Sequence, residues 1–271
     1  MRIVNNNGIE LAVEIIGEGE PLIFAHGLSG NRKFTLEQFS SLADRYQVIA
    51  YDQRGHGDST PITGPALYDA HAMAGDITVI MDKLGLEQVI LGGESMGAAT
   101  SLLFALKHPQ RVKALLLTAP AFSDKANAEK ERMQQMGEEL RKGDMQDFLQ
   151  KSARRMRVDF NMPEDVIRKI AWMQSVHQPE SLGMACKTVI DWKIFPDIQA
   201  LKELPMPCCI LAWANDPLHP FELAQQMSRI IPRAKLIFLD SLLELFTDPA
   251  DIGSRYCSFL GSLPGLVNSA E

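Results

Sequence analysis

The sequence predicts an α/β protein whose mainly parallel, eight-stranded sheet carries helices on both faces. Short apolar runs of strand length recur along the chain, and helical patterns separate the later ones. A second observation is the stretch over residues 122–204, which has no strand pattern and is rich in helix formers. Together these features indicate an alternating α/β unit that is interrupted once by a helical insertion.

The elements of the sheet unit can be placed in chain order. The expected strands cover residues 2–4, 10–15, 22–25, 47–51, 89–92, 112–117, 208–213 and 235–239. The first strand is expected to end at Asn7-Gly8, a dipeptide that favours a tight hairpin turn. Helical patterns cover residues 34–43, 70–84, 96–107, 221–231 and 251–260. This alternation requires crossover connections, which is why most strands should run parallel.

Residues 122–204 are expected to fold as a helical insertion, because a structureless loop of this length is uncommon in a compact domain. Ser123-Asp124 precedes an alanine- and glutamate-rich run, and Pro163-Glu164 opens another helix. The predicted core unit therefore combines residues 1–121 with residues 205–271. Seven methionines of the insertion either line an adaptable apolar pocket or pack in its core: Met133, Met136, Met145, Met156, Met162, Met173 and Met184.

The charge balance argues against two classes of partner. A formal net charge of −7 is unlike the basic surface that binds nucleic acid or an anionic membrane. We therefore expect neither of these partners, and a small-molecule ligand instead. The sequence leaves the oligomeric state open.

Targeting and cofactor signals are the next class of features. Residues 1–8 lack the apolar core of a secretory signal, and no run approaches the roughly 18 apolar residues of a membrane span. The four cysteines have neither zinc-ligand spacing nor the pattern of a disulfide framework. These features predict a soluble, cytoplasmic protein. No Walker motif or dinucleotide fingerprint occurs, so neither a cofactor nor a metal is expected.

The sequence Gly-Gly-Glu-Ser-Met-Gly at residues 92–97 is the strongest functional signal. It follows an apolar strand pattern and opens a helical one. A sharp strand-to-helix turn lifts a hydroxyl clear of its neighbours, and such a turn tolerates almost no side chain at the flanking positions of Gly93 and Gly97. Ser95 is therefore the predicted nucleophile. The alternative is a glycine-rich turn that only joins the two elements.

Two backbone amides are predicted to form an oxyanion hole with this turn. The N–H of Met96 lies at the start of the new helix, where unpaired donors favour negative charge. The second donor should come from the loop after the strand at residues 22–25, and we assign it to Leu28. His26 in the same loop could be read as a general base, but a loop-shaping role is favoured.

The charged loop over residues 52–59 has two readings. One Asp, one His and a second Asp in a glycine-rich context suggest phosphate or metal binding. However, their spacing matches no recognised ligand set, so a structural loop with an arginine–carboxylate pair is favoured.

With these motifs in place, the chain resembles the α/β-hydrolase fold family over most of its length. The matching pieces are His26-Gly27, the loop at residues 51–59, the turn at Ser95 and the segment at residues 215–220, in the order of the family. The resemblance implies a catalytic triad in the chain order Ser, then Asp or Glu, then His. It assigns the second role to Asp216, which follows the strand at residues 208–213. It also implies that residues 122–204 form a cap over the nucleophile.

The third triad position departs from the family pattern. The resemblance places the histidine between the last strand and the last helix, but residues 240–249 contain none. Measured back from Pro249, the expected position falls on Leu242, and all six histidines lie at or before His219. Because leucine cannot accept the proton of a serine, activity is expected to be severely impaired.

Three explanations for the missing base stay open at this point. The base was removed from an ordinary hydrolase, the protein is a ligand-binding member without turnover, or another group acts as base. The candidate replacements are His219, Glu244 and Glu94.

The functional expectation is a serine hydrolase of uncharged, mostly apolar carboxylic esters, thioesters or lactones, by analogy with the family. The substrate is expected to contact His26, Gly27, Glu94, Phe122 and Trp192. The alternatives are a silent ligand-binding member of the fold, and a lyase or synthase that uses only the oxyanion hole.

Overall fold

The structure is a computed structural model that describes residues 1–264, so the end of the predicted core unit, residues 265–271, lies outside the described residues. An eight-stranded sheet forms its centre, as predicted. The strands are β1 (Arg2–Asn6), β2 (Ile9–Ile16), β3 (Glu20–Ala25), β4 (Tyr46–Tyr51), β5 (Val89–Glu94), β6 (Val112–Thr118), β7 (Cys208–Ala212) and β8 (Ala234–Phe238).

The sheet order is β1-β2-β4-β3-β5-β6-β7-β8. The β1–β2 and β2–β4 pairs are antiparallel, and all later pairs are parallel. The first turn uses Asn7 and Gly8 with positive φ angles of 52° and 91°, as the hairpin prediction requires. Because β3, β5 and β7 run parallel, the loops that follow them emerge at one edge of the sheet, where α/β proteins bind ligands.

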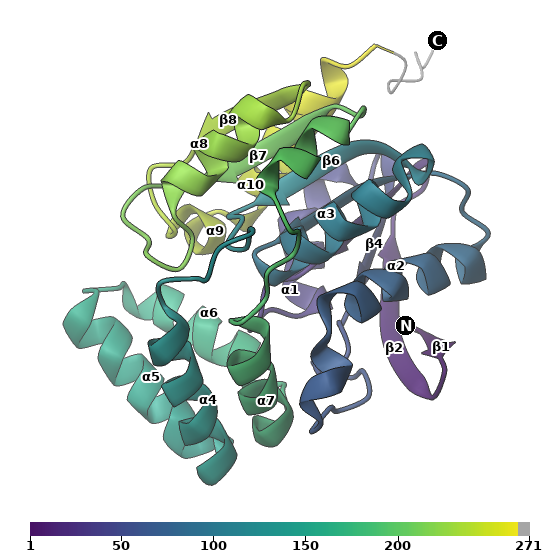
Figure 1. Cartoon of the computed structure of the whole chain (residues 1–271). Coiled ribbons are helices and arrows are strands. Elements are labelled where there is room, and N and C mark those ends of the chain that lie inside the picture. Colours follow the sequence, from purple (N-terminus) through teal and green to yellow (C-terminus); the bar gives the residue numbers. More distant parts are fainter. Residues whose placement is uncertain (265–271) are drawn as a thin grey trace.

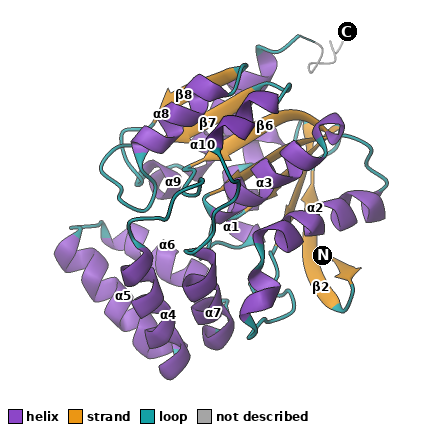
Figure 2. Cartoon of the chain, viewed as in Figure 1, coloured by secondary structure: helices purple, strands orange, loops and turns teal. Residues whose placement is uncertain are grey.

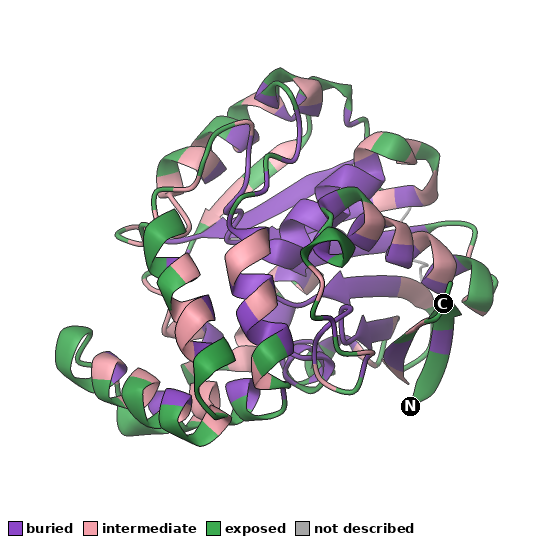
Figure 3. Ribbon diagram, turned by 60° about the horizontal axis from the view of Figure 1, so that its bottom comes forward, coloured by how far each residue is buried: buried purple, intermediate pink, exposed green. Residues whose placement is uncertain are grey.

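Helices cover both faces of the sheet (Figure 2). One face packs against α2 (Ala70–Leu84), α3 (Met96–Lys107) and α8 (Phe221–Ile230), and the other against α1 (Arg32–Gln38) and α10 (Pro249–Gly261). Figure 3 shows that the strands are largely buried, while the outer sides of the helices are exposed. Short helical turns complete the unit: η1 (Ser40–Leu42), η2 (Pro65–Tyr68), η3 (Pro109–Arg111), η4 (Ile198–Glu203) and α9 (Glu244–Thr247).

Four further helices lie between β6 and β7 and gather at one end of the molecule (Figure 1). They are α4 (Lys130–Lys142), α5 (Met145–Asp159), α6 (Glu164–Ser175) and α7 (Pro179–Val189). Helix α4 packs on α7, and α5 packs on α6. Met133, Leu140, Phe148 and Leu182 form a small apolar core between them. In residues 1–264, no helix has both the length and the apolarity needed to cross a membrane.

The start of α4 differs from the sequence expectation. Ser123 does act as a cap, but only of a turn, because its Oγ accepts the N–H of Lys125 at 3.1 Å. The helix itself begins at Lys130. The expectation for the later helix is confirmed, because Pro163 directly precedes the first residue of α6, Glu164.

Candidate active site

Ser95 occupies a strained turn between β5 and α3. Its φ and ψ angles are 51° and −107°, a conformation with positive φ that residues with a side chain rarely adopt. The surrounding structure holds this conformation, since the Ser95 N–H donates to Thr118 O at 2.9 Å and Ser95 O accepts from Ala99 N–H at 3.1 Å. Only 8% of the residue is exposed. The turn therefore presents a single hydroxyl at the carboxyl end of β5.

The two glycines beside Ser95 are required by close packing of the backbone. A Cβ atom on Gly93 would lie 2.2 Å from the carbonyl carbon of Gly97, and one on Gly97 would lie 2.0 Å from Ala25 O. Both distances are far below any real contact of a Cβ atom. The pattern at residues 92–97 is thus set by steric limits that bring α3 against the end of β3.

An imidazole and a carboxylate form a row with the Ser95 hydroxyl. His219 Nε2 lies 2.9 Å from Ser95 Oγ, and His219 Nδ1 lies 2.8 Å from Asp216 Oδ2. Both partners come from the loop between β7 and α8, and the side chains of His219 and Asp216 are only 14% and 17% exposed. The row can move a proton from the hydroxyl to the ring.

The loop that carries Asp216 and His219 is organised by the carboxylate itself. Asp216 Oδ1 accepts the N–H of Leu218 at 3.0 Å and that of His219 at 3.3 Å, which closes a tight turn. Asp216 Oδ2 accepts both the His219 ring and Trp213 Nε1 at 3.0 Å. Asn215 precedes the turn with a φ of 61°. The same side chain therefore shapes the loop and orients the ring.

The partners define the protonation of the row. A carboxylate only accepts hydrogen bonds, so Nδ1 of His219 carries the proton, and the lone pair of Nε2 faces Ser95 Oγ. Burial raises the pKa of Asp216, but hydrogen bonds from His219, Trp213 and Leu218 lower it overall to about 2. Asp216 is thus ionised at neutral pH.

The expectation that Ser95 lacks an imidazole partner is therefore wrong. His219, the first of the three candidate replacements, supplies the ring, and the chain order Ser, Asp, His is kept. Leu242 lies between β8 and α9, packs against the apolar core of the α10 face and reaches the same cavity as Asp216 and His219. Sequence reasoning named His219 only as one of three candidates, because the family pattern pointed to the loop after β8, although the Asp-x-x-His spacing was visible.

The two predicted amide donors belong to different elements, Leu28 to the loop after β3 and Met96 to the start of α3. Gly27 O accepts His26 Nδ1 at 2.7 Å and the N–H of Gly30 at 2.9 Å. Because a trans peptide points its C=O and N–H in opposite directions, the Leu28 N–H faces away from these two donors. Met96 is the first residue of α3. Its N–H therefore has no hydrogen-bond acceptor within the helix, because no helical turn precedes it.

Two predicted substrate contacts of this loop have different environments. His26 is buried and uses both ring nitrogens, since Nε2 accepts the N–H of Gln53 at 3.0 Å. This ring shapes the loop and leaves no nitrogen for a ligand. Gly27 approaches Glu94 so closely that a Cβ atom there would lie 3.0 Å from Glu94 Oε1. Burial raises the pKa of Glu94.

The remaining predicted substrate contacts lie in the apolar core next to α7. The Phe122 and Trp192 rings pack with centroids 5.6 Å apart, and both residues are buried. Trp192 Nε1 donates to Tyr68 O at 2.8 Å. These contacts are those of a packed core, so a direct role in binding stays a prediction.

The loop at residues 52–59 has the structural character that was favoured. Arg54 donates to both carboxylate oxygens of Asp76, at 2.8 and 2.7 Å, in a buried pair. Arg32 Nη1 donates to Asp52 Oδ2, and the backbone N–H of Arg32 donates to Asp52 Oδ1 at 2.7 Å. Among the described residues, no group of three or more His, Cys, Asp and Glu side chains is arranged to hold a metal ion.

A cavity of about 580 Å³ adjoins the row of polar side chains. Asp216, His219 and Leu242 form part of its wall, and Trp213, Phe160 and Met162 add apolar surface. Phe160 and Met162 come from the link between α5 and α6. The four-helix segment and the core therefore enclose this space together.

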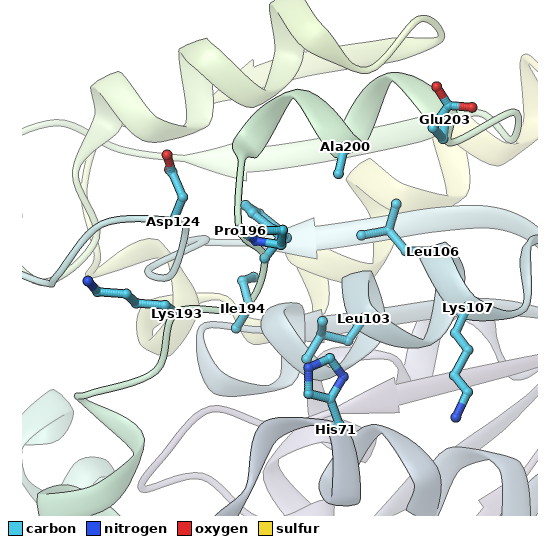
Figure 4. Close-up of a pocket in the computed structure, with 11 residues that line it drawn as sticks. His71, Leu103, Leu106, Lys107, Asp124, Lys193, Ile194, Pro196, Ala200 and Glu203 are labelled. Atoms are coloured by element: carbon cyan, nitrogen blue, oxygen red, sulfur yellow. The ribbon is translucent and has the colours of Figure 1, made fainter.

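A second cavity, of about 720 Å³, lies elsewhere, between α3 and the segment that precedes η4 (Figure 4). Leu103, Leu106 and Ile194 give it an apolar floor, and the charged groups at its rim have both signs. Ser95, Asp216 and His219 do not line it. His71 at its edge is an exposed imidazole away from the polar row.

Comparison with known proteins places the chain in a family. The model of the α/β hydrolase fold family matches residues 20–241. The chain belongs to the α/β hydrolase fold family. The AB hydrolase superfamily protein YisY of Bacillus subtilis is 29% identical over 245 residues, which cover 84% of this chain and 86% of that protein.

Other family members show the range of relatives. Epoxide hydrolase 2 of Siraitia grosvenorii is 39% identical over 116 residues, which are 42% of this chain and only 36% of that protein. The match thus spans only about a third of the length of that relative. The structure of a thermophilic esterase from Thermogutta terrifontis is similar with a TM-score of 0.80 and 29% identity, covering 96% of this chain and 97% of the other. The enol-lactonase of Burkholderia xenovorans shares the fold, with a TM-score of 0.80, 20% identity and coverage of 96% and 100%.

Proposed function

We propose that this α/β hydrolase cleaves carboxylic esters, thioesters or lactones through Ser95, with His219 as general base and Asp216 as the group that orients it. The observation that carries the proposal is the continuous row of contacts, 2.9 Å from Ser95 to His219 and 2.8 Å from His219 to Asp216. A serine hydroxyl becomes a useful nucleophile when a base with this geometry takes its proton. His219 thereby removes the reason to expect a silent member of the fold.

The reaction follows from the roles of these groups. Ser95 Oγ attacks the substrate carbonyl carbon while its proton passes to His219 Nε2, and the carbonyl oxygen becomes an oxyanion. The N–H groups of Leu28 and Met96 stabilise that charge. The intermediate collapses, and the leaving alcohol, thiol or lactone oxygen takes the proton from His219. Water then attacks the acyl-enzyme with His219 again as base, which releases the acid and restores Ser95.

The surroundings support uncharged, mostly apolar substrates. Trp213, Leu242, Phe160 and Met162 give the adjoining cavity apolar walls. The similar structures include an esterase and an enol-lactonase, which fits an acyl-transfer reaction but does not define the acyl group. The substrate class therefore rests on the cavity and on the nucleophile.

Residues 122–204 act as a cap in this proposal. Leu28 and Leu218, which adjoin the site, pack against the apolar core of α4, α5 and α7. Asn127 Nδ2 donates to Leu218 O at 2.9 Å, next to His219. A cap in this position would shield the acyl-enzyme from water that is not aligned by the base.

The proposal is tested by 4-nitrophenyl butyrate hydrolysis and by labelling with a fluorophosphonate. We expect turnover by the unaltered protein, a covalent adduct on Ser95 by peptide mass spectrometry, and loss of both in Ser95→Ala. Ser258→Ala, which changes an exposed serine of α10, is the matched control. Hydrolysis that survives in Ser95→Ala, or an adduct on another residue, would overturn the proposal.

A further inference from the structure

Three buried imidazoles lie in a row beside the proposed oxyanion loop. His26 and His56 have ring centroids 5.1 Å apart, and His56 and His177 have centroids 5.2 Å apart, both in edge-on geometry. None of these residues is more than 4% exposed. The proposed acyl transfer uses none of them. Such a cluster of buried titratable rings requires an explanation.

The His56 and His177 rings contact carbonyl groups of the loop that carries the Leu28 amide. His56 Nε2 lies 2.6 Å from Leu28 O, and His177 Nε2 lies 3.2 Å from Ser29 O. His26 already holds the preceding carbonyl, that of Gly27. Three successive carbonyls are thus fixed by three imidazoles, and this leaves the peptide that contains the Leu28 N–H little freedom to rotate.

His177 comes from a distant part of the chain. It lies in the turn between α6 and α7, and its Nδ1 accepts the N–H of Gly57 at 3.0 Å. The ring proton is therefore on Nε2, where it is donated to Ser29 O. Burial and the neighbouring rings lower the pKa of His177 to about 3, so the ring is neutral and keeps this tautomer at neutral pH.

The loop that carries His56 is held in place by contacts of its own. Arg54, two residues before His56, is held by its buried pair with Asp76. Nearby, Ser181 of α7 donates to Gly55 O at 2.8 Å and accepts the N–H of Ile62 at 2.8 Å. The α6–α7 turn is therefore attached to the loop at residues 52–59, and both are attached to the oxyanion loop.

We propose that His56 and His177 are positioning residues for the Leu28 amide, so that seating of the α6–α7 turn on the core sets the geometry of the oxyanion hole. The inference rests on the proposed function. It makes the four-helix segment part of the apparatus that stabilises the transition state, in addition to its role as a cover. Loss of one oxyanion donor costs about a hundredfold to a thousandfold in kcat, so a displaced donor should cost about tenfold to a hundredfold.

The experiment compares His177→Gln with His177→Asn. The Gln amide can reach Ser29 O with an N–H donor, whereas the shorter Asn amide cannot. Both variants keep a polar side chain at the site, which favours folding. For each variant, kcat and KM for 4-nitrophenyl butyrate and the affinity for a phenylboronic acid are measured, because the boronate forms a tetrahedral adduct on Ser95 whose oxygen occupies the oxyanion hole. His71→Ala is the control for loss of an imidazole outside the site.

We expect kcat and boronate affinity of His177→Asn to fall together by about tenfold to a hundredfold, with KM changed by less than about threefold. His177→Gln should recover most of the loss. Unchanged kcat in His177→Asn would overturn the inference. Equal losses of kcat in His177→Asn and His177→Gln, accompanied by a lowered melting temperature in both variants, would overturn it too. If the unaltered protein neither hydrolyses the ester nor is labelled at Ser95, the proposed function fails instead, so the two failures are distinguishable.

Discussion

His219 follows Asp216 by three residues, and the His219 ring meets the Asp216 carboxylate at 2.8 Å within one turn. The imidazole that we propose as base and the carboxylate that we propose to orient it therefore come from a single loop after β7. In the proposed mechanism, a base at this turn removes the need for a histidine in the loop after β8, where Leu242 lies. Because Asp216 Oδ1 also closes the turn, the local backbone fixes the distance between the two side chains.

The shared cavity of Leu242 and His219 leads to a rescue experiment. Both residues line the same space beside Asp216. We therefore expect His219→Ala/Leu242→His to hydrolyse 4-nitrophenyl butyrate at least about tenfold faster than His219→Ala, because a general base contributes about a hundredfold or more when well placed. Leu242→His alone should not raise kcat by orders of magnitude, since His219 already serves Ser95.

The matched control for the rescue is His219→Ala/Leu243→His. Leu243 lines the same cavity one residue further along. An equal gain in this control would show that any nearby imidazole suffices, and absence of a gain at Leu242 would remove that position from reach of the serine.

The neutral buried rings make stability depend on pH. The pKa values of His26 and His177 are lowered to about 3 by burial and by neighbouring rings, from an ordinary value near 6.5. Below about pH 6.5 the unfolded chain binds protons that the folded chain does not, so this contribution to stability is complete above that pH and is lost as the pH falls toward 3. Each ring should add a slope of about 1.4 kcal/mol per pH unit.

Urea unfolding between pH 7.5 and pH 4.5 measures this slope. We expect the free energy of unfolding of His177→Gln to fall less steeply over this range than that of the unaltered protein. Identical slopes would show that His177 is not held neutral in the folded state.

Steric limits at the nucleophile turn give a stability prediction. A Cβ atom on Gly97 would lie 2.0 Å from Ala25 O, so Gly97→Ala must displace the start of α3. We expect a loss of about 1–3 kcal/mol in the free energy of unfolding and a reduced kcat. Gly75 in α2 has no atom within 4 Å of its Cβ position, and Gly75→Ala should stabilise the protein by about 0.5–1 kcal/mol. Thermal denaturation of both variants measures these changes in stability. Equal shifts of the melting temperature in Gly97→Ala and Gly75→Ala would contradict the prediction.

The regular elements could be predicted from the sequence because local signals agree with the fold. The helices expected at residues 70–84 and 96–107 match α2 and α3. Asp69 caps α2 by accepting the N–H of Ala72, and Gly85 ends it with a φ of 69°. The start of α4 was wrong because a serine cap serves short turns as well as helices, and the sequence pattern does not separate the two cases.

The candidate site could be predicted only in part. Ser95 and Asp216 each follow a predicted strand and lie among residues typical of turns. The sequence therefore indicates that the chain changes direction at both positions. The position of His219 depends on how the turn at Asp216 folds back toward β5, which no periodicity records. The three-imidazole row is less visible still, since His177 lies 148 residues from Ser29, whose carbonyl it binds.

The central claim is that His219 is the base for Ser95, and kcat for 4-nitrophenyl butyrate in His219→Ala tests it most directly. We expect kcat to fall by at least about ten-thousandfold relative to the unaltered protein, with residual turnover from the oxyanion hole, while His71→Ala stays near the unaltered rate. A His219→Ala variant that retains ordinary turnover would contradict the account.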